Sequence, residues 1–244
     1  MRLPSWLAQH IAALRALLVF TVLLGLAYPL AMVAVGRLPG LADRTGGSLV
    51  TVGSTLIGQS FTDADGNPVP RYFQSRPSAA GDGYDPTSTA ASNLGPSDIV
   101  DTADRPSLLT QVCARSVAVG VLEGVDGSRP YCTADGVGAV LEVFRRYGLT
   151  GPVTRAIAVN GPAFVSTWEG VAVESGPAAV TTGVLTAVRG DAPADPAVPA
   201  DAVTASASGI DPHISVAYAE LQAPRVARER SLPLEQVHRL IAEH

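Results

Sequence analysis

The stretch Ala16–Gly36, ALLVFTVLLGLAYPLAMVAVG, decides the architecture of this 244-residue chain. It contains no charged side chain and is rich in Leu, Val and Ala. A run of about 20 apolar residues is long enough for a helix to cross the hydrocarbon core of a bilayer. A helix also pairs its backbone polar groups within the segment, as lipid requires. We therefore expect an α+β soluble domain on a single N-terminal transmembrane helix, with residues 1–15 as a short tail.

A cleaved signal peptide is the alternative interpretation of this stretch. The run is longer than the apolar region of a usual signal peptide, and Ala31–Ala34 does not form an Ala-x-Ala cleavage site. The flanking arginines give no orientation. Arg2 and Arg15 precede the run, and Arg37 and Arg44 follow it. The sequence predicts a retained anchor and leaves its direction open, because orientation follows the side that carries more basic residues.

The basic residues exclude several classes of function. All 17 of them are arginine, and the chain has no lysine. A Walker A loop, a protein-kinase site and Schiff-base chemistry each need a lysine. The part after the anchor holds all 22 acidic residues and 15 arginines, which gives it a formal charge of −7. Arginines spread along an acidic chain argue against nucleic-acid binding, which usually requires clustered basic charge.

The soluble part begins with signals for extended structure. Ser48–Phe61 and Val69–Phe73 are expected to pair as a hairpin across the turn Asp65–Pro68. Arg76–Thr102, rich in Gly, Ser, Asp and Pro, predicts a long irregular loop of the kind that often binds a ligand. Further along, helices are expected over Leu108–Glu123 and Val137–Tyr147, strands over Val153–Val159, Phe164–Glu174 and Val180–Val188, and a linker over Asp191–Pro199.

Two helices are expected at the C-terminal end. Asp211-Pro212 predicts a helix start, because Asp caps free backbone N–H groups and Pro suits the first helical position. That helix should end near Pro224. A second helix should open at Ser231–Pro233 and present one apolar face, formed by Leu234, Val237, Leu240 and Ile241.

The search for catalytic residues is mostly negative. The chain lacks His-Glu-x-x-His, Cys-x-x-Cys and Gly-x-Ser-x-Gly motifs. Ser208, Asp211 and His213 could be assembled into a hydrolase triad, but neighbours on one short segment rarely point together. We interpret them as a Ser-rich turn, a helix cap and a surface histidine. Arg225 and Arg228 are interpreted as a solvated helix face. The sequence therefore predicts neither a catalytic residue nor a metal site.

The two cysteines, Cys113 and Cys132, leave two possibilities open. An even count in the soluble part fits one disulfide in an oxidising compartment. Two buried thiols in a reducing compartment fit equally well.

Four ordered blocks then resemble the signatures of one family. They are Gly53–Phe61 (GSTLIGQSF), Tyr72–Ala79 (YFQSRPSA), Ala91–Ser97 (ASNLGPS) and Val203–Ser215 (VTASASGIDPHIS), the last continued by Gln222 and Arg225–Ala227. These blocks are similar to those of the KdpC family, the C subunits of potassium-transporting P-type ATPases. The residues that carry the resemblance are Gly58, Gln59, Arg76, Pro77, Ser78, Asn93, Gly95, Pro96, Asp211, Pro212, His213, Ser215 and Arg225. Departures are Asp98, Ala207 and Val216, which stand where the family usually has Asn, Gly and Pro.

The resemblance implies a domain organisation. Residues 37–109 and 197–244 would form the soluble core of the family, and residues 110–196 a β-rich inserted lobe, as in its longer members. Without lysine, the chain also lacks the Asp-Lys-Thr-Gly-Thr loop that P-type motors phosphorylate. An accessory, non-catalytic subunit in the cytoplasmic (inner) membrane is therefore expected, with a KdpA-like channel subunit, a KdpB-like ATPase subunit and a small KdpF-like subunit as partners, besides the lipid bilayer.

Two roles follow from the resemblance, and they conflict. As a catalytic chaperone, the subunit would raise the ATP affinity of the catalytic subunit in a ternary complex, with no permanently bound cofactor. Ser208, Gly209 and Gln222 would then be the nucleotide-binding candidates. Alternatively, the soluble domain lies outside the membrane over the channel subunit, where cytoplasmic ATP is out of reach. A membrane-anchored extracytoplasmic hydrolase or a ligand-binding module stays open as an alternative.

Overall fold

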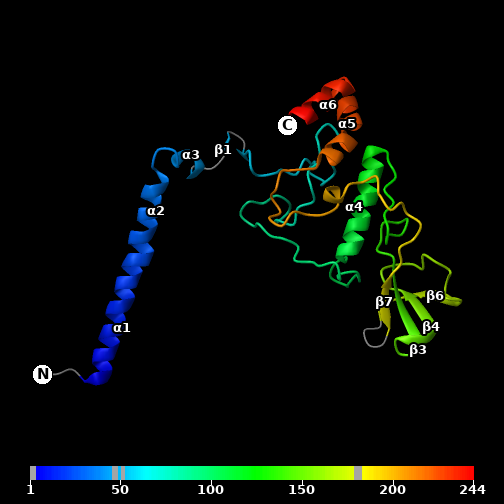
Figure 1. Ribbon diagram of the computed structural model, residues 1–244, viewed down its shortest axis with the longest axis horizontal. Helices are drawn as coiled ribbons and strands as arrows, with labels where there is room; N and C mark the ends of the chain where they lie inside the picture. The colour runs from blue at the N-terminus through cyan, green and yellow to red at the C-terminus, as the bar shows by residue number, and fades with distance from the viewer. Residues whose placement is uncertain (1–3, 46–48, 51–52, 179–182) are drawn as a thin grey trace. The chain divides into compact units, whose positions relative to one another are not determined.

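The computed structural model describes the whole chain except residues 1–3, 46–48, 51–52 and 179–182 (Figure 1). It divides into two compact units, Met1–Leu56 and Ile57–His244. Each unit is described separately.

The first unit is dominated by one helix, Ser5–Gly36, which is long and apolar enough to cross a membrane. It consists of α1 (Ser5–Val22), the π-helical turn η1 (Leu23–Ala27) and α2 (Tyr28–Gly36). The wider turn lies just before Pro29, whose ring excludes the ordinary helical hydrogen bond. The helix expected over Ala16–Gly36 is confirmed and extends further toward the N-terminus. Short elements follow: α3 (Ala42–Thr45), β1 (Leu49–Val50) and β2 (Gly53–Ser54).

The second unit combines helices with a mixed sheet, as the α+β prediction required. Its elements in chain order are α4 (Leu108–Glu123), β3 (Val140–Tyr147), β4 (Thr150–Ala158), β5 (Thr167–Trp168), β6 (Val171–Ser175), β7 (Val184–Ala187), the 3₁₀ turn η2 (Ala200–Ala202), α5 (Val216–Arg230) and α6 (Leu234–Glu243). The described strands run in the order β5-β6-β4-β3-β7, with only β4 and β6 parallel.

The sheet buries apolar residues on both of its faces. Leu141 and Val143 of β3 pack toward Phe164 and Val171. Val140, one residue away, packs on the other face with Leu109 of α4. Successive strand residues point to opposite faces, so a two-sided core needs this near-continuous apolar run in β3. We call β3–β7 and their connections the sheet lobe.

The helices enclose a separate core. Tyr218 of α5 packs with Val198, Val203 and, on α4, Val119. Val237 of α6 packs against α5 and Phe73 in a second cluster. We call α4, α5, α6, η2 and the segment 57–84 the helical core. Helix α4 touches both parts, since Leu109 packs on the sheet and Val119 packs with α5 (Figure 1).

Two predictions about local structure are wrong. Val137–Tyr147 is not a helix, because its apolar spacing fits a strand as well and residues of β3 pair with β4 and β7. Helix α5 does not begin at Asp211-Pro212. Ser215 is its N-cap, accepting from the Tyr218 amide at 3.0 Å, and Asp201 holds Ser215 in place. Pro224 lies inside α5 instead of ending it.

Other predictions are confirmed. Helix α4 has the expected bounds. Strands β4 and β7 lie in the first and third of the expected strand segments, and the second segment, Phe164–Glu174, contains both β5 and most of β6. The expected hairpin is confirmed only at its turn: Thr62 and Pro68 form an antiparallel bridge, Asp63 accepts from the turn amides of Asp65 and Asn67, and Val69–Phe73 forms no strand. Parts of Ser48–Phe61 and Val180–Val188 lie outside the described residues. The boundaries of the inserted lobe at 110 and 196 stay a prediction.

Candidate functional site

A buried ion pair joins the last residue of α4 to a residue inside α5 in the helical core. The Arg225 side chain of α5 is 2% exposed, and that of Glu123, the last residue of α4, is 0% exposed. Arg225 Nη2 and Nε donate to the Glu123 carboxylate at 2.9–3.0 Å. Arg225 Nη1 also donates to the carbonyls of Pro70 and Tyr72. Arg225 is therefore not the solvated surface residue that the sequence suggested, although Arg228 is exposed.

The neighbouring Gln222 ties α5 to the hairpin segment. Its Oε1 accepts from the Gln74 amide at 2.6 Å, and its Nε2 donates to the Gln74 carbonyl at 3.1 Å. Its Oε1 also accepts from Arg225. The Gln74 side chain in turn donates to carbonyls of the hairpin, those of Phe61 and Val69 among them. Gln222 is fully buried, and its side-chain amide joins α5 to the backbone of Gln74.

Glycine and serine residues of the signature blocks form a second group of tight contacts. Ser78 Oγ donates to the Gly209 carbonyl and accepts from the Tyr84 amide. Gly209 has φ +72°, and a Cβ there would lie 2.8 Å from Ala80. A Cβ at Gly58 would lie 2.3 Å from the Tyr84 ring. These two glycines are required because the loops approach too closely for any side chain.

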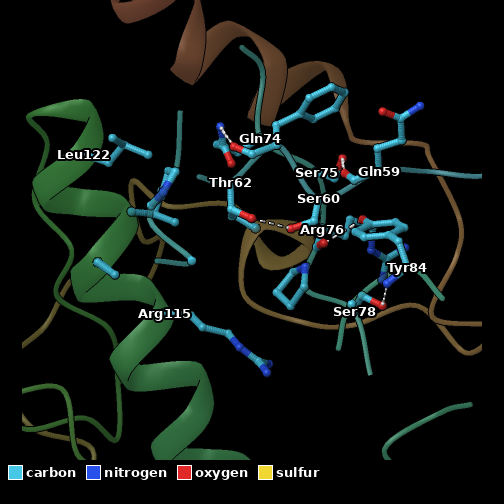
Figure 2. A pocket seen from close by; sticks show the side chains of 18 of the residues that line it. Gln59, Ser60, Thr62, Gln74, Ser75, Arg76, Ser78, Tyr84, Arg115 and Leu122 are labelled. Atoms are coloured by element: carbon cyan, nitrogen blue, oxygen red, sulfur yellow. Dashed lines mark hydrogen bonds between the residues drawn. The ribbon is translucent and has the colours of Figure 1, made fainter. Parts of the chain in front are cut away.

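Two arginines donate hydrogen bonds to one short run of backbone. Arg76 donates to the carbonyls of Thr204 and Ala205 at 3.3 Å. Arg115, on α4, donates to the carbonyl of Val203 at 3.1 Å. Both line a cleft of about 400 Å³ between α4 and the segment Gln59–Tyr84 (Figure 2). Arg115 stands outside every signature block, so no local pattern pointed to it.

The three residues of the imagined hydrolase triad do not come together as a triad. Asp211 Oδ1 lies 2.6 Å from His213 Nδ1 and accepts from the His213 amide, and these bonds lower the pKa of Asp211. Ser208 Oγ accepts from the Ile210 amide instead. Within the described chain no hydrogen bond links Ser208 to His213, whose side chain is 81% exposed. Asp211 also lies 3.7 Å from Arg76.

Some of the other signature positions lie in the loop before α4, and others line the cleft. Asn93 adopts a left-handed conformation with φ +54°, and Gly95 and Pro96 follow it in the same irregular loop. Beyond them, Asp98 accepts from the Leu108 amide at the start of α4 and pairs with Arg105. The Arg105 guanidinium beside it lowers the pKa of Asp98. This loop therefore anchors α4. Gln59, Pro77 and Ser78 line the cleft, and Pro212 lies beside Gly58.

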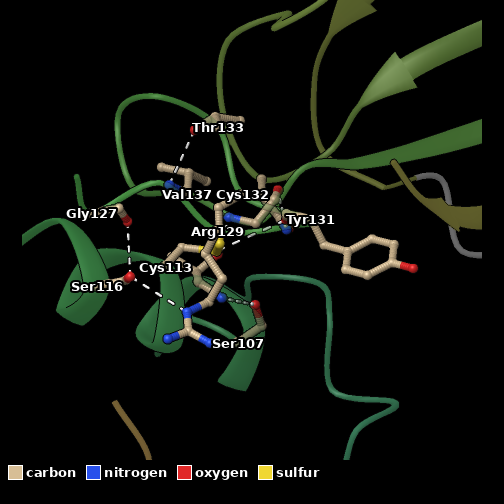
Figure 3. Close-up of a disulfide and its surroundings, with 12 residues drawn as sticks. Ser107, Cys113, Ser116, Gly127, Arg129, Tyr131, Cys132, Thr133 and Val137 are labelled. Carbon is tan, nitrogen blue, oxygen red and sulfur yellow. Dashed lines mark hydrogen bonds between the residues drawn. A yellow bond between two sulfur atoms is a disulfide. The ribbon is translucent and has the colours of Figure 1, made fainter. Parts of the chain in front are cut away.

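The two cysteines form a disulfide, one of the two possibilities that the sequence left open (Figure 3). It links Cys113 of α4 to Cys132 in the loop that leads into β3, with Cα atoms 5.5 Å apart. Nearby, Ser116 donates to the Gly127 carbonyl, and Arg129 donates to Ser116 and to the Val198 carbonyl. The disulfide thus joins the helical core to the entry of the sheet lobe.

The residues predicted to meet nucleotide are divided between different settings. Ser208 and Gly209 lie in the turn before α5, where Gly209 accepts from Ser78. Gln222 lies buried in α5, with its amide engaged by Gln74 and Arg225. Nucleotide contact by these three residues stays a prediction. Among the residues that the structure describes, no three metal-ligating side chains come together.

Comparison with known proteins identifies relatives over nearly the whole chain. The family model described as K⁺-transporting ATPase, c chain (KdpC) matches residues 10–116 and 176–244. The potassium-transporting ATPase KdpC subunit of Mycobacterium tuberculosis is 34% identical over 241 residues, covering 97% of this chain and 85% of the relative. The KdpC subunit of Kineococcus radiotolerans is 36% identical over 248 aligned positions, covering 99% of this chain and 84% of the relative.

These comparisons also bear on the insertion. Residues 117–175 separate the two matched segments of the family model. The alignments to the two relatives nevertheless cover at least 97% of the chain, so they extend through most of this region. The family model covers more than half of the chain, and both relatives exceed 30% identity. The chain therefore belongs to the KdpC family, the C chains of K⁺-transporting ATPases.

Proposed function

We propose that this chain is the accessory C subunit of an ATP-driven potassium uptake pump, and that its soluble domain lies on the extracytoplasmic side of the cytoplasmic membrane. Family membership and the single apolar helix support a single-pass subunit of the transport complex. Its partners would be the KdpA-like, KdpB-like and KdpF-like subunits. The side of the membrane is the new element of this proposal.

The Cys113–Cys132 disulfide is the observation that carries the placement. Disulfides persist in oxidising compartments and are rare where thiols are kept reduced. Cys113 is fully buried and lies in α4, at the junction of the helical core and the sheet lobe. A disulfide in that position is part of the buried structure of the domain and is not a bond between two exposed thiols. The favoured compartment is therefore outside the cytoplasm.

An extracytoplasmic domain acts through its surfaces. It cannot reach cytoplasmic ATP, so its contribution would be to assembly and to the entry side of the channel subunit. The soluble part carries a formal charge of −7. Such a charge raises the local cation concentration modestly, and salt screens the effect within about 10 Å. This field would raise the K⁺ concentration near the entrance of the channel subunit.

Direct ATP contact is the competing role, and the structure makes it costly. Gln222 would have to release Gln74 and Arg225 before its amide could meet a base. Breaking buried hydrogen bonds costs about 1–3 kcal/mol for each polar group left unpaired. This role requires a cytoplasmic domain, so one topology experiment separates the two.

The experiment places a single reactive thiol on the domain. Val121 of α4 is 80% exposed, so Val121→Cys adds an accessible thiol, while the native cysteines are bonded to each other. Intact cells are treated with a membrane-impermeant maleimide. We expect labelling in intact cells. Labelling only after permeabilisation would overturn the placement and restore the case for ATP contact.

Co-purification tests the subunit assignment independently. A tagged full-length chain should retain the channel and ATPase subunits through detergent extraction. Purification of the chain alone from cells that express all subunits would contradict the assignment, whatever the topology.

A further inference from the structure

We infer that the cleft between α4 and the segment Gln59–Tyr84 binds a carboxylate, supplied by an acidic side chain of a partner subunit. The identity of the partner rests on the proposed function, but the chemistry of the cleft does not. One wall is formed by the hairpin and by Ser75–Ser78. The other is a face of α4 that carries Arg115, Val119 and Leu122 (Figure 2).

Positive charge is concentrated at one side of this cleft. Arg115 and Arg76 donate to the carbonyls of the consecutive residues Val203, Thr204 and Ala205. Both guanidinium groups therefore contact the same short stretch of backbone from within the lining of the cleft. Carbonyl oxygens stabilise them only partly, because these oxygens carry no net charge. An anion at this side of the cleft would be attracted by both positive charges.

Arg115 has unused capacity for such an anion. It donates to Val203 and to Gln111 Oε1, whereas a guanidinium has five N–H donors. Within the described chain, no carboxylate lies within 4 Å of Arg115. Burial lowers the pKa of Arg115, so its charge is poorly solvated. Arginine and carboxylate can join through two parallel hydrogen bonds, which makes this pairing strong and directional.

Tyr218 supplies a second, independent indication. It lines the cleft and is only 2% exposed. Its hydroxyl makes no hydrogen bond to another described residue and is not completely enclosed, so it is open to the cleft. An oxyanion in the cleft would accept from this hydroxyl. The hydroxyls of Ser60 and Thr62, 3.0 Å apart at the rim, add further donors.

The remaining lining favours a single negative charge. Asp82 lines the cleft, and Asp211 lies 3.7 Å from Arg76 while also bonding His213. These two carboxylates oppose a multiply charged ligand such as a polyphosphate. Phe61, Pro68 and Leu122 provide apolar contact for the aliphatic stem of an aspartate or glutamate. A side-chain carboxylate therefore fits better than a nucleotide.

Arg129 provides the matched control for a purely structural role. It is also partly buried, burial also lowers its pKa, and it also donates to a backbone carbonyl, that of Val198. It does not line the cleft. If Arg115 served only to hold the backbone, the two arginines would behave alike in every assay.

The test compares arginine modification in the isolated full-length chain and in the assembled pump. Both samples are treated with phenylglyoxal, and modified residues are identified by peptide mass spectrometry. We expect Arg115 to react in the isolated chain and to be protected in the complex. Arg129 should react equally in both samples, and exposed Arg228 should react in both. Equal modification of Arg115 in both samples, or no reaction in the isolated chain, would overturn the inference.

Added anions distinguish the sources of the carboxylate. Sodium glutamate at millimolar concentration, added to the isolated chain, should protect Arg115 only weakly, because it lacks the geometry of a docked partner. Complete protection by glutamate alone would assign the cleft to a free carboxylate rather than to a partner. Protection by ATP but not by glutamate would overturn the carboxylate assignment. If no complex forms, the proposed function fails, while the glutamate arm still reports on the cleft.

Two substitutions extend the test to assembly. Arg115→Met should weaken retention of the chain in the complex by about tenfold, the effect of one charge-assisted contact. Arg129→Met should leave retention unchanged. Tyr218→Phe removes only the unpaired hydroxyl, so the thermal midpoint of the isolated chain should not fall, while retention should weaken by several-fold. Equal retention of the Arg115→Met, Arg129→Met and wild-type chains would contradict the inference.

Discussion

The helical core and the sheet lobe are stabilised by different kinds of contact. In the helical core, one ion pair is almost completely buried: Arg225 is 2% and Glu123 is 0% exposed. In the sheet lobe the core clusters are formed by apolar side chains, with Glu142 of β3 buried beside them, and the ion pair of Arg155 and Glu174 lies at the surface, about half exposed. The loss of one buried charge strands its partner, whereas a surface charge regains water. The two regions should therefore respond very differently to the same type of substitution.

The largest effect is expected from breaking the buried pair. Arg225→Met leaves Glu123 buried without a cation and frees the carbonyls of Pro70 and Tyr72. Removing one partner of a buried pair costs about 3–5 kcal/mol. The free energy of unfolding should fall by that amount in chemical denaturation of the full-length chain, followed by circular dichroism.

A second substitution separates the charge effect from lost packing. Adding Glu123→Leu to Arg225→Met removes the stranded carboxylate, so part of the lost stability should return. Arg228→Met, which removes an exposed arginine from the same helix, serves as the control. If Arg228→Met destabilised the chain as much as Arg225→Met, burial would not be the deciding factor.

The disulfide should rank second, because it ties the two regions together. The disulfide closes a loop between residues 113 and 132. Loss of a disulfide that closes a loop of this length lowers the free energy of unfolding by about 3 kcal/mol. Cys113→Ala with Cys132→Ala should therefore lower the thermal midpoint markedly. Wild-type chain in reductant should unfold at the midpoint of the double variant. Equal midpoints of wild-type chain with and without reductant would show that the bond adds nothing.

The sequence predicted the architecture well where local chemistry determines it. The apolar run, helix α4 and the β-branched strands all follow from local patterns. Val137–Tyr147 failed because a short apolar run has the spacing of a helix and of a strand alike. Only pairing with distant residues, such as Leu141 with Ala158, decides between the two.

The candidate site was less predictable for a related reason. The signature blocks identified Arg76, Ser78 and Gly209, but not the partners that give them a role. Arg115 and Tyr218 face the cleft only because α4 and α5 pack together, and no local pattern encodes that packing. Asp211 followed by Pro212 looked like a helix cap, yet its carboxylate bonds His213 and lies near Arg76.

The third prediction concerns close packing within the helical core. Gly58→Ala would place a Cβ 2.3 Å from the Tyr84 ring, which burial and the neighbouring loops hold in place. Overpacking of this kind costs about 1–3 kcal/mol. Gly95→Ala is the control, because its nearest contact would be Ser97 Oγ at 3.9 Å. Both variants are compared by thermal unfolding. A thermal midpoint for Gly58→Ala equal to that of Gly95→Ala would mean that the Tyr84 ring can move aside to make room for the added Cβ.

The smallest effect is expected at the surface of the sheet lobe, and it should depend on pH. The Arg155 guanidinium lowers the pKa of Glu174, as Arg145 does for Glu169. A carboxylate whose pKa is lower in the folded than in the unfolded state stabilises the fold above its unfolded pKa. That stabilisation is lost as pH falls through the folded pKa, because the protonated group no longer pairs. Glu174→Gln should therefore lower the thermal midpoint slightly at neutral pH and low salt, and not at all in acid or in high salt, which screens exposed charges. A pH-independent loss in Glu174→Gln would indicate lost packing rather than charge. A loss of stability in Glu174→Gln as large as that in Arg225→Met would contradict the contrast between the two regions, because an exposed ion pair would then contribute as much stability as a buried one.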